Sequence, residues 1–330
     1  MNNPSGENTG GTLLLALDAG GTKTALRLLD MAGDTINEVR VAGVANSYPG
    51  VLPVGQTLKD GLRQLTSHPE KISYVFGSVG GPNAPEVQAA LEALLTGAVC
   101  IRIVRESTGA MQLPVAQEYG APAVVLAGTG SVAFSRSNGR FLFAGGWGPV
   151  WDDKGSGGDL GRQGLRRWLR EVDHRAQVSG LQEVFGSLSE NLDVESYEGL
   201  LALQKRVLAL SRSQVAAFAP ALFELAWKGD EVALELVRQE AEELALLAAA
   251  VTPEPPRGGA NGILGCGGLF QAGETFRQMC REALKVQRPG WRWLFIRDRS
   301  MLGPASRMVL EMAGVKDKEL LSRMIGGYDE

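Results

Sequence analysis

Residues 13–29 read LLLALDAGGTKTALRLL: an apolar run, a glycine-rich turn and a second apolar run. The two runs predict short buried β-strands at residues 13–18 and 25–29, joined by a tight turn. Backbone N–H groups of such a turn can bind phosphate oxygens, and Asp18 beside them can hold Mg²⁺ through water. The alternative is a plain β-turn with an exposed aspartate. The turn is not a Walker A loop, because GxxxxGK[ST] is absent.

The same plan recurs later in the chain. Residues 123–127 (AVVLA) predict another strand, and the turn Gly128-Thr129-Gly130-Ser131 follows it. Two more strands are predicted in this half, at residues 132–136 and 140–144, on either side of a hairpin signal at 137–139. In the first half, the matching third strand is predicted at residues 36–42. Ordinary hairpins would also produce such turns. Two turns at equivalent points, however, indicate a nucleotide held between two similar halves.

Further elements follow from apolar periodicity. Strands are expected at residues 71–79, 99–104, 262–264 and 291–296, and helices at 85–95, 160–171, 231–251, 271–285 and 305–312, with several more between 181 and 226. The helix at 231–251 has the clearest pattern, with Ala233, Val237, Ala241, Leu244 and Ala248 on one face. Asp230 is expected to cap its start.

Two further glycine clusters indicate binding sites. Gly265-Cys266-Gly267-Gly268 precedes a predicted helix, where glycines let a flat ring or a phosphate approach the backbone. Helix–strand packing is the alternative there. Residues 145–157 (GGWGPVWDDKGSG) combine two tryptophans with two aspartates. Aromatic surface beside a carboxylate suits a sugar, whereas the alternative is a buried tryptophan and a solvated acidic loop.

Composition narrows the class of protein. The chain has 330 residues, 44% of them hydrophobic and 21% charged, which is typical of a globular protein with two domains. The net charge of −4 gives no broad basic surface for nucleic acid. Three separated cysteines without zinc-binding spacing suit a reducing cytoplasm: Cys100, Cys266 and Cys280. No apolar run reaches the roughly 18 residues of a membrane span. Residues 1–11 lack a signal-peptide pattern and are expected to be a flexible tail.

In their order and spacing, the four motifs resemble those of the BadF/BadG/BcrA/BcrD ATPase family, which includes N-acetylglucosamine kinases. The resemblance covers roughly residues 12–312. It implies an α/β fold of two actin-like ATPase (ribonuclease H-like) domains with a nucleotide cleft between them. We expect an N-terminal domain at residues 12–116 and a C-terminal domain at 117–300. Residues 301–330 are expected to form a closing helix and tail that pack towards the N-terminal domain.

The resemblance also implies what each motif binds. DAGGTKT at residues 18–24 is similar to the family's first phosphate motif, AGTGS at 127–131 to the second, and LGCGGLF at 264–270 to the adenosine motif. The implied nucleotide-binding residues are Asp18, Gly20, Gly21, Thr22, Lys23, Thr24, Gly128, Thr129, Gly130, Ser131, Gly265, Gly267 and Gly268, with Mg²⁺ held through Asp18. The implied sugar-binding residues are Asn46, Gly146, Trp147 and Asp153.

The sequence departs from the family pattern at three places. Where related kinases carry Asn-Asp, with the aspartate as general base, this chain has Arg105-Glu106. The resemblance therefore implies that Glu106 accepts the hydroxyl proton with a side chain one methylene longer. Lys154 replaces a glutamate beside the sugar motif, and Ser306-Arg307 replaces a Gly-Ala pair in the last helix.

The leading hypothesis is an ATP-dependent kinase that phosphorylates a hydroxyl of a sugar or amino sugar, with N-acetylglucosamine or glucosamine as first candidates. The alternatives are a non-catalytic nucleotide or sugar sensor and an ATPase of the same fold. An activator ATPase of radical dehydratases would need a cluster-binding cysteine pair that this sequence lacks, and neither of the two histidines belongs to a hydrolase motif. We expect a cytoplasmic protein without nucleic-acid or membrane partners, and the resemblance allows a homodimer.

Overall fold

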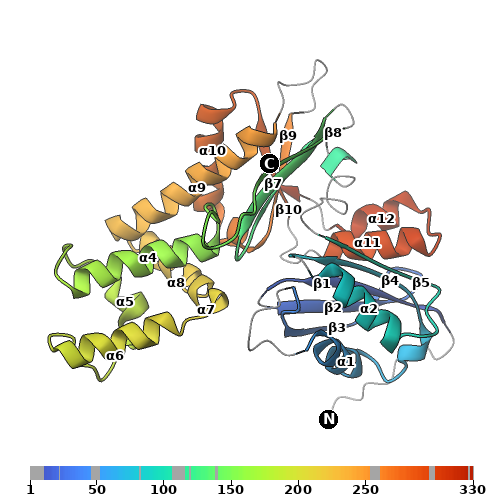
Figure 1. Cartoon of the computed structure of the whole chain (residues 1–330). Helices are drawn as coiled ribbons and strands as arrows, with labels where there is room; N and C mark the ends of the chain where they lie inside the picture. The colour runs from blue at the N-terminus through green and yellow to red at the C-terminus, as the bar shows by residue number, and fades with distance from the viewer. Residues whose placement is uncertain are drawn as a thin grey trace, which may run out of the picture. The chain divides into compact units, whose positions relative to one another are not determined.

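The computed structural model describes residues 11–21, 23–45, 53–81, 83–105, 116–118, 120–137, 140–252, 261–296, 302–325 and 328–329. The chain divides into two compact units (Figure 1). The first comprises Met1–Val115 and Ile296–Tyr328, and the second comprises Ala116–Phe295 and Asp329–Glu330. The domain boundaries expected from the sequence stay predictions.

The first unit is built on a five-stranded sheet with the strand order β3-β2-β1-β4-β5. β1 pairs antiparallel with β2 and parallel with β4; β2 and β3 are antiparallel, and β4 and β5 are parallel. The elements of this unit are β1 (Leu13–Ala19), β2 (Lys23–Leu29), β3 (Thr35–Ala42), α1 (Val54–Leu65), β4 (Ile72–Val79), α2 (Ala84–Leu94), β5 (Cys100–Arg105), α11 (Leu302–Met312) and α12 (Lys318–Arg323).

Helices cover both faces of this sheet. Alternate residues of β1 point to opposite sides. Leu15 and Leu17 belong to an apolar cluster with α1 and α2, whereas Leu14 and Ala16 belong to a second cluster with α11. Because both sides of β1 are buried, the strand is a continuous apolar run instead of an alternating one.

The second unit repeats this topology. Its six-stranded sheet has the order β11-β10-β9-β6-β7-β8. β6 pairs antiparallel with β7 and parallel with β9; β7 and β8 are antiparallel, and β9 and β10 are parallel. The series β8-β7-β6-β9-β10 therefore matches β3-β2-β1-β4-β5 in order and direction. This match confirms the α/β fold class and the repeat expected from the sequence.

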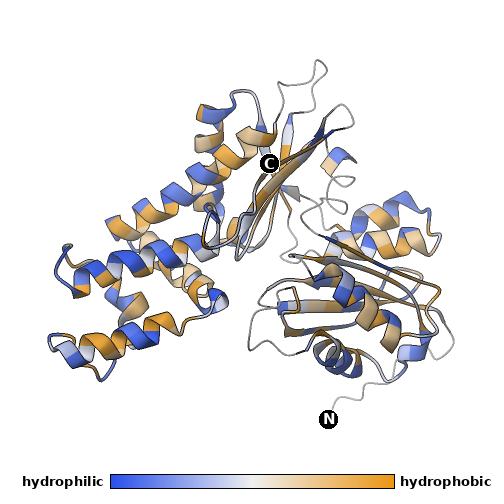
Figure 2. Ribbon diagram, viewed as in Figure 1, coloured by the Kyte–Doolittle hydropathy of each residue, from blue (hydrophilic) through white to orange (hydrophobic). Residues whose placement is uncertain are grey.

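The second unit also carries most of the helices that the structure describes. Figure 2 shows that they have an apolar side and a polar side, and the apolar sides supply the large core cluster of this unit. Its elements are β6 (Ala123–Ala127), β7 (Ser131–Ser137), β8 (Arg140–Gly145), α4 (Gly157–Val172), α5 (Gln182–Phe185), α6 (Tyr197–Leu208), α7 (Arg212–Ala216), α8 (Ala219–Trp227), α9 (Glu231–Val251), β9 (Gly262–Cys266), α10 (Glu274–Gln287), β10 (Arg292–Ile296) and β11 (Tyr328–Asp329). In the part of the chain that the structure describes, no helix combines the length and apolar character needed to cross a membrane.

Helix α9 agrees with the sequence in detail. The five residues expected on its inner face are all buried. Asp230 caps the helix, because its Oδ1 accepts a hydrogen bond from the N–H of Ala233 at 2.8 Å.

Five helices differ from the sequence-based expectation. Two of them lie near the end of the chain: α11 begins at Leu302 and not at 305, and α12 was not predicted. α1 was not predicted, although its buried residues Val54, Leu58, Leu62 and Leu65 have helical spacing. α4 was expected to begin at residue 160 but begins at Gly157, because the Ser156 side chain caps it there. Glycines have low helix propensity, which hid this start. α10 begins three residues later than expected, after a glycine with positive φ at 273.

Candidate active site

The turn between β1 and β2 is closed by a backbone hydrogen bond, since Gly20 donates its N–H to the carbonyl of Lys23 at 2.9 Å. The buried hydroxyl of Thr24 accepts a hydrogen bond from the N–H of Val44 at 3.2 Å. A Cβ on Gly43 would overlap the backbone of Gly21, so only glycine permits this approach. The segment that follows β3 therefore lies directly against the first turn.

Asp18 lies half-buried near the end of β1, in register with Ser78 on the parallel strand β4. Residues in register on neighbouring strands point to the same side of a sheet. The Oγ of Ser78 is buried and has no hydrogen-bond partner among the described residues. A carboxylate beside an orphaned hydroxyl suits a hydrated Mg²⁺, which keeps several waters and needs only one or two carboxylates.

The second turn, between β6 and β7, is held by its own backbone and by the tryptophan-containing segment. Gly128 donates its N–H to the carbonyl of Gly130 at 2.9 Å. The hydroxyl of Ser131 donates a hydrogen bond to the carbonyl of Lys154. Gly146 donates its N–H to the carbonyl of Ser131 at 2.9 Å. The structure thus brings the second and fourth sequence motifs together.

The N-terminus of α4 lies against this second turn. Gly157 donates its N–H to the carbonyl of Gly128 at 2.8 Å. A Cβ on Gly158 would overlap the carbonyl oxygen of Thr129, so the close approach of helix and turn requires glycine. The positive end of the helix dipole therefore lies at the second turn, where it favours an anion.

The three glycines of the third motif have different roles. Gly265 lies inside β9, where a Cβ would come within 2.9 Å of the ring of Phe295. Gly267 has φ of 106°, and a Cβ there would overlap the carbonyl of Ala127. Gly268 is exposed, and a Cβ there would meet no atom within 4 Å. Because β6 and β9 are parallel neighbours, this motif adjoins the second turn, and Gly268 is its open position.

An ion pair that the sequence did not predict lies beside the second turn. Asp153 is 3% exposed, and its Oδ2 is 2.6 Å from Nη2 of Arg212 on α7. Burial raises the pKa of the Asp153 carboxyl, while the charge and hydrogen bond of Arg212 act in the opposite direction. The expected sugar contact of Asp153 stays a prediction, since the carboxylate here bonds to Arg212.

Glu240 of α9 is a second buried acid near this turn. Burial and the negative charge of Asp159 raise the pKa of the Glu240 carboxyl to about 9, and a hydrogen bond between the two carboxyl groups adds to the shift. Hydrogen bonds from the backbone N–H groups of Gly155 and Ser156 partly oppose it. Glu240 is therefore a neutral acid at pH 7.

The tryptophans of the fourth motif are exposed, Trp147 to 70% and Trp151 to 83%. The alternative of a buried tryptophan is therefore wrong. Lys154, which replaces a glutamate of the family pattern, places its Nζ 2.5 Å from Oε1 of Glu243 on α9. The hydrogen bond to Glu243 and its charge raise the pKa of Lys154. The positive charge that the substitution introduces is thus paired with a carboxylate.

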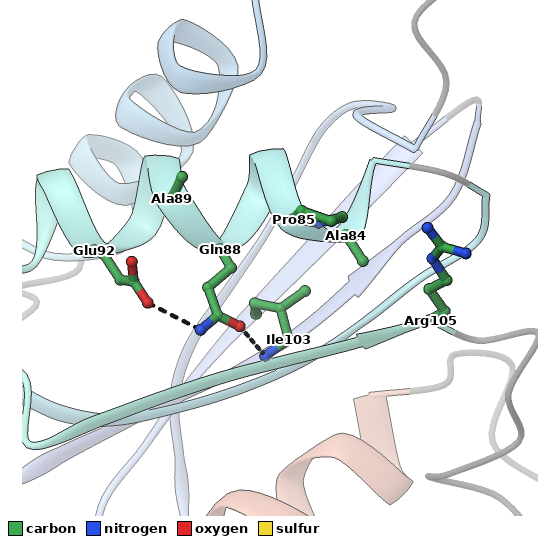
Figure 3. Close-up of a pocket in the computed structure, with 7 residues that line it drawn as sticks. All are labelled: Ala84, Pro85, Gln88, Ala89, Glu92, Ile103 and Arg105. Atoms are coloured by element: carbon green, nitrogen blue, oxygen red, sulfur yellow. Dashed lines mark hydrogen bonds between the residues drawn. The ribbon is translucent and has the colours of Figure 1, made fainter.

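Three predicted site residues lie outside the described residues: Thr22, Asn46 and Glu106. Arg105, which precedes Glu106 in the sequence, lines a cavity of about 470 Å³ between α2 and β5 (Figure 3). Gln88 crosses this cavity: its carbonyl accepts the N–H of Ile103 at 3.1 Å, and its amide donates to Glu92 at 2.9 Å. The N–H of Ile103 on the edge strand β5 is thereby satisfied, which protects that edge.

Three residues that sequence analysis missed thus belong to the two turn regions: Ser78, Arg212 and Glu240. Ser78 is in register with Asp18, and this pairing depends on the parallel arrangement of β1 and β4. The other two approach the second turn from helices far along the chain. No local pattern marks any of them.

Known proteins similar to this chain include an ATPase family and several sugar kinases. The sequence profile of the BadF/BadG/BcrA/BcrD ATPase family matches residues 15–289. A N-acetylmuramic acid/N-acetylglucosamine kinase from Clostridium acetobutylicum is 24% identical over 245 residues, which is 72% of this chain and 78% of the relative. A glucosamine kinase from Vibrio cholerae is 25% identical over 243 residues, covering 72% and 79%. A Chromobacterium violaceum protein, proposed to be an N-acetylglucosamine kinase, has a similar crystal structure. The TM-score between the two structures is 0.67 at 21% sequence identity, and the match covers 91% of this chain and 99% of the other.

Proposed function

The chain belongs to the BadF/BadG/BcrA/BcrD ATPase family, and on this premise we propose that it is an ATP-dependent kinase acting on a hydroxyl of a sugar or amino sugar. N-acetylglucosamine and glucosamine are the first candidates, because similar proteins carry the names of kinases for these sugars. One observation carries the proposal: two sheets of the same strand order each place a glycine turn after their central strand.

The two turns and the third glycine motif bind the nucleotide. Gly20, Gly21 and Lys23 offer the backbone of the first turn to phosphate oxygens, and residues 128–131 offer the second. Helix α4 supports the second turn with its positive end. Gly268 leaves the backbone open for the adenosine portion. Positioning and charge stabilisation then account for most of the catalysis of phosphoryl transfer.

Asp18 is the residue that would hold Mg²⁺, with the orphaned hydroxyl of Ser78 next to it. The ion supplies charge neutralisation of the phosphates when it is bound. The role of Asp18 is to fix the position of that charge through water. The half-buried setting of its carboxylate at the end of β1 suits this role.

Glu106 is the proposed general base, because it follows β5, whose carboxyl end lies in the same sheet as that of β1. Replacement by glutamine keeps the shape and removes the base. We expect Glu106→Gln to lower turnover by at least about two orders of magnitude with unchanged ADP affinity. The matched control is Glu86→Gln on the exposed side of α2. Unchanged turnover in Glu106→Gln would assign the base to another group.

The alternative is a sensor or an ATPase of the same fold. A coupled ADP-release assay with a panel of sugars and a no-acceptor control separates these functions. A kinase releases ADP in response to its acceptor sugar. A sensor binds nucleotide without releasing ADP, and an ATPase releases ADP equally in the no-acceptor control. A cytoplasmic location and a homodimer stay predictions, the second of which light scattering of the purified protein tests.

A further inference from the structure

Arg212 connects the second turn with the helical part of the unit. It is the first residue of α7, and its Nη2 lies 2.6 Å from Oδ2 of Asp153. Asp153 is almost fully buried, whereas 28% of the Arg212 side chain is exposed. The Arg212 side chain is therefore partly exposed while its guanidinium is held by a buried carboxylate.

Gly130 shows how closely this ion pair approaches the turn. A Cβ on Gly130 would overlap Nη2 of Arg212, and it would lie 2.9 Å from Oδ1 of Asp153. Nη2 of Arg212 and Oδ1 of Asp153 thus both border the space next to the Cα of Gly130. An anion bound to the backbone of this turn would thus meet the guanidinium at short range.

Most hydrogen-bond donors of Arg212 are unused. A guanidinium carries five N–H donors. Among the described residues, the Arg212 side chain makes one hydrogen bond, to Asp153, and its Nε is buried without a partner. An unsatisfied buried N–H costs about 1–3 kcal/mol. A guanidinium that one carboxylate fixes in place, with donors left over, is suited to a second anion with several oxygens.

We propose that Arg212 binds a phosphoryl group of the nucleotide at the second turn, and that Asp153 positions the guanidinium for this contact. The inference rests on the proposed function and adds a residue outside the four sequence motifs. Its ligand class is a nucleoside diphosphate or triphosphate. The N-terminus of α4 adds positive potential nearby, whereas the charge of Arg162 is paired with Asp159.

Calorimetry of ADP binding to the full-length protein tests the proposal. We expect Arg212→Gln to weaken ADP affinity at least about tenfold, equivalent to about 1.4 kcal/mol. Adenosine affinity, measured by competition, stays unchanged because adenosine has no phosphate. The matched control is Arg238→Gln on α9, whose ion pair with Glu235 is exposed. This control keeps wild-type affinity for ADP.

Two further variants separate binding from folding. Arg212→Lys keeps a cation beside Asp153 but loses the planar fork, and we expect intermediate ADP affinity. The double variant Asp153→Asn/Arg212→Gln removes both charges, so no buried carboxylate is left unpaired. We expect it to fold and to bind ADP as weakly as Arg212→Gln. An ADP affinity within about twofold of wild type in any folded Arg212 variant overturns this inference. The proposed kinase function would still hold in that case, because it does not depend on Arg212. A wild-type protein that binds neither ADP nor ATP at millimolar nucleotide overturns the proposed function as well.

Discussion

The side chain of Glu240 on α9 supports the loop before α4 by accepting a hydrogen bond from Gly155, with 2.6 Å between Oε2 and the backbone nitrogen. The same oxygen lies 3.0 Å from the nitrogen of Ser156, which caps α4. The N-terminus of α4 in turn lies against the second glycine turn. A buried neutral acid thus holds the segment that supports the proposed phosphate site.

This acid makes stability depend on pH. The folded pKa of Glu240 is raised to about 9 from an ordinary value of 4.5, so the folded protein retains a proton that the unfolded chain loses. The contribution is complete below pH 4.5 and declines as pH rises towards 9. The amide of Glu240→Gln can make similar hydrogen bonds but does not titrate. We expect the wild-type free energy of unfolding to fall from pH 6 to pH 8 by at least about 2 kcal/mol more than that of the variant.

Urea denaturation of both proteins at these two pH values measures the difference directly. Groups away from Glu240 titrate alike in the two proteins, so the comparison isolates Glu240 together with Asp159, to which it is hydrogen-bonded. Parallel stability profiles would show that Glu240 is ionised in the folded protein at neutral pH.

Gly267 and Gly268 are expected to respond differently to alanine. Gly267 has φ of 106° and lies against the carbonyl of Ala127, so Gly267→Ala should destabilise the fold by at least about 2 kcal/mol. Gly268 has open space around it, so Gly268→Ala should keep wild-type stability and weaken ADP binding. Thermal unfolding and ADP calorimetry on both variants check these outcomes. Wild-type ADP affinity in Gly268→Ala would remove this position from the nucleotide site.

Asp18 should couple nucleotide affinity to Mg²⁺. Asp18→Asn keeps the size of the side chain and removes its charge, so we expect the gain in ATP affinity on adding Mg²⁺ to fall at least about tenfold. Asp60→Asn on the exposed side of α1 is the control. Calorimetric titrations with ATP, in the presence of Mg²⁺ and of a chelator, give the four affinities needed. Equal Mg²⁺ dependence in the two variants would place the ion elsewhere.

Lys154 should matter little for stability. Its pair with Glu243 is largely exposed, with 53% of the lysine side chain accessible, and such pairs contribute about 0–1 kcal/mol. Lys154→Ala should therefore lower the unfolding free energy by less than about 1 kcal/mol. Lys154→Glu restores the family residue but faces Glu243, so it should be the less stable variant at low salt. High salt should remove the difference between the two variants, and a difference that persists in 1 M salt would contradict a purely electrostatic origin.

The sequence predicted the framework of the fold because local features determine it. The apolar run at Leu13–Ala19 is buried on both sides, and the inner face and the Asp230 cap of α9 lie on one continuous helix. α1 was missed although its buried positions from Val54 to Leu65 are spaced as in a helix, because Gly55 and Gly61 lower the helix propensity of this segment.

The remainder of the site depends on tertiary contacts. Arg212 lies 59 residues from Asp153, and Glu240 lies 85 residues from Gly155. Nothing local to either segment indicates that these side chains meet. The same holds for Ser78 and Asp18, whose proximity follows from the pairing of β1 with β4. Motif spacing could locate the turns together with Asp18 and Asp153, but it could not identify Ser78, Arg212 and Glu240 beside them.

The most direct test of the account is to detect the phosphorylated product. Wild-type protein is incubated with ATP, Mg²⁺ and N-acetylglucosamine or glucosamine, and phosphorus-31 NMR then follows every phosphate species. The account predicts a new phosphomonoester signal that grows with ADP and requires the sugar. Release of inorganic phosphate with ADP, at the same rate with and without sugar, would contradict it, as would unchanged ATP with every sugar tested.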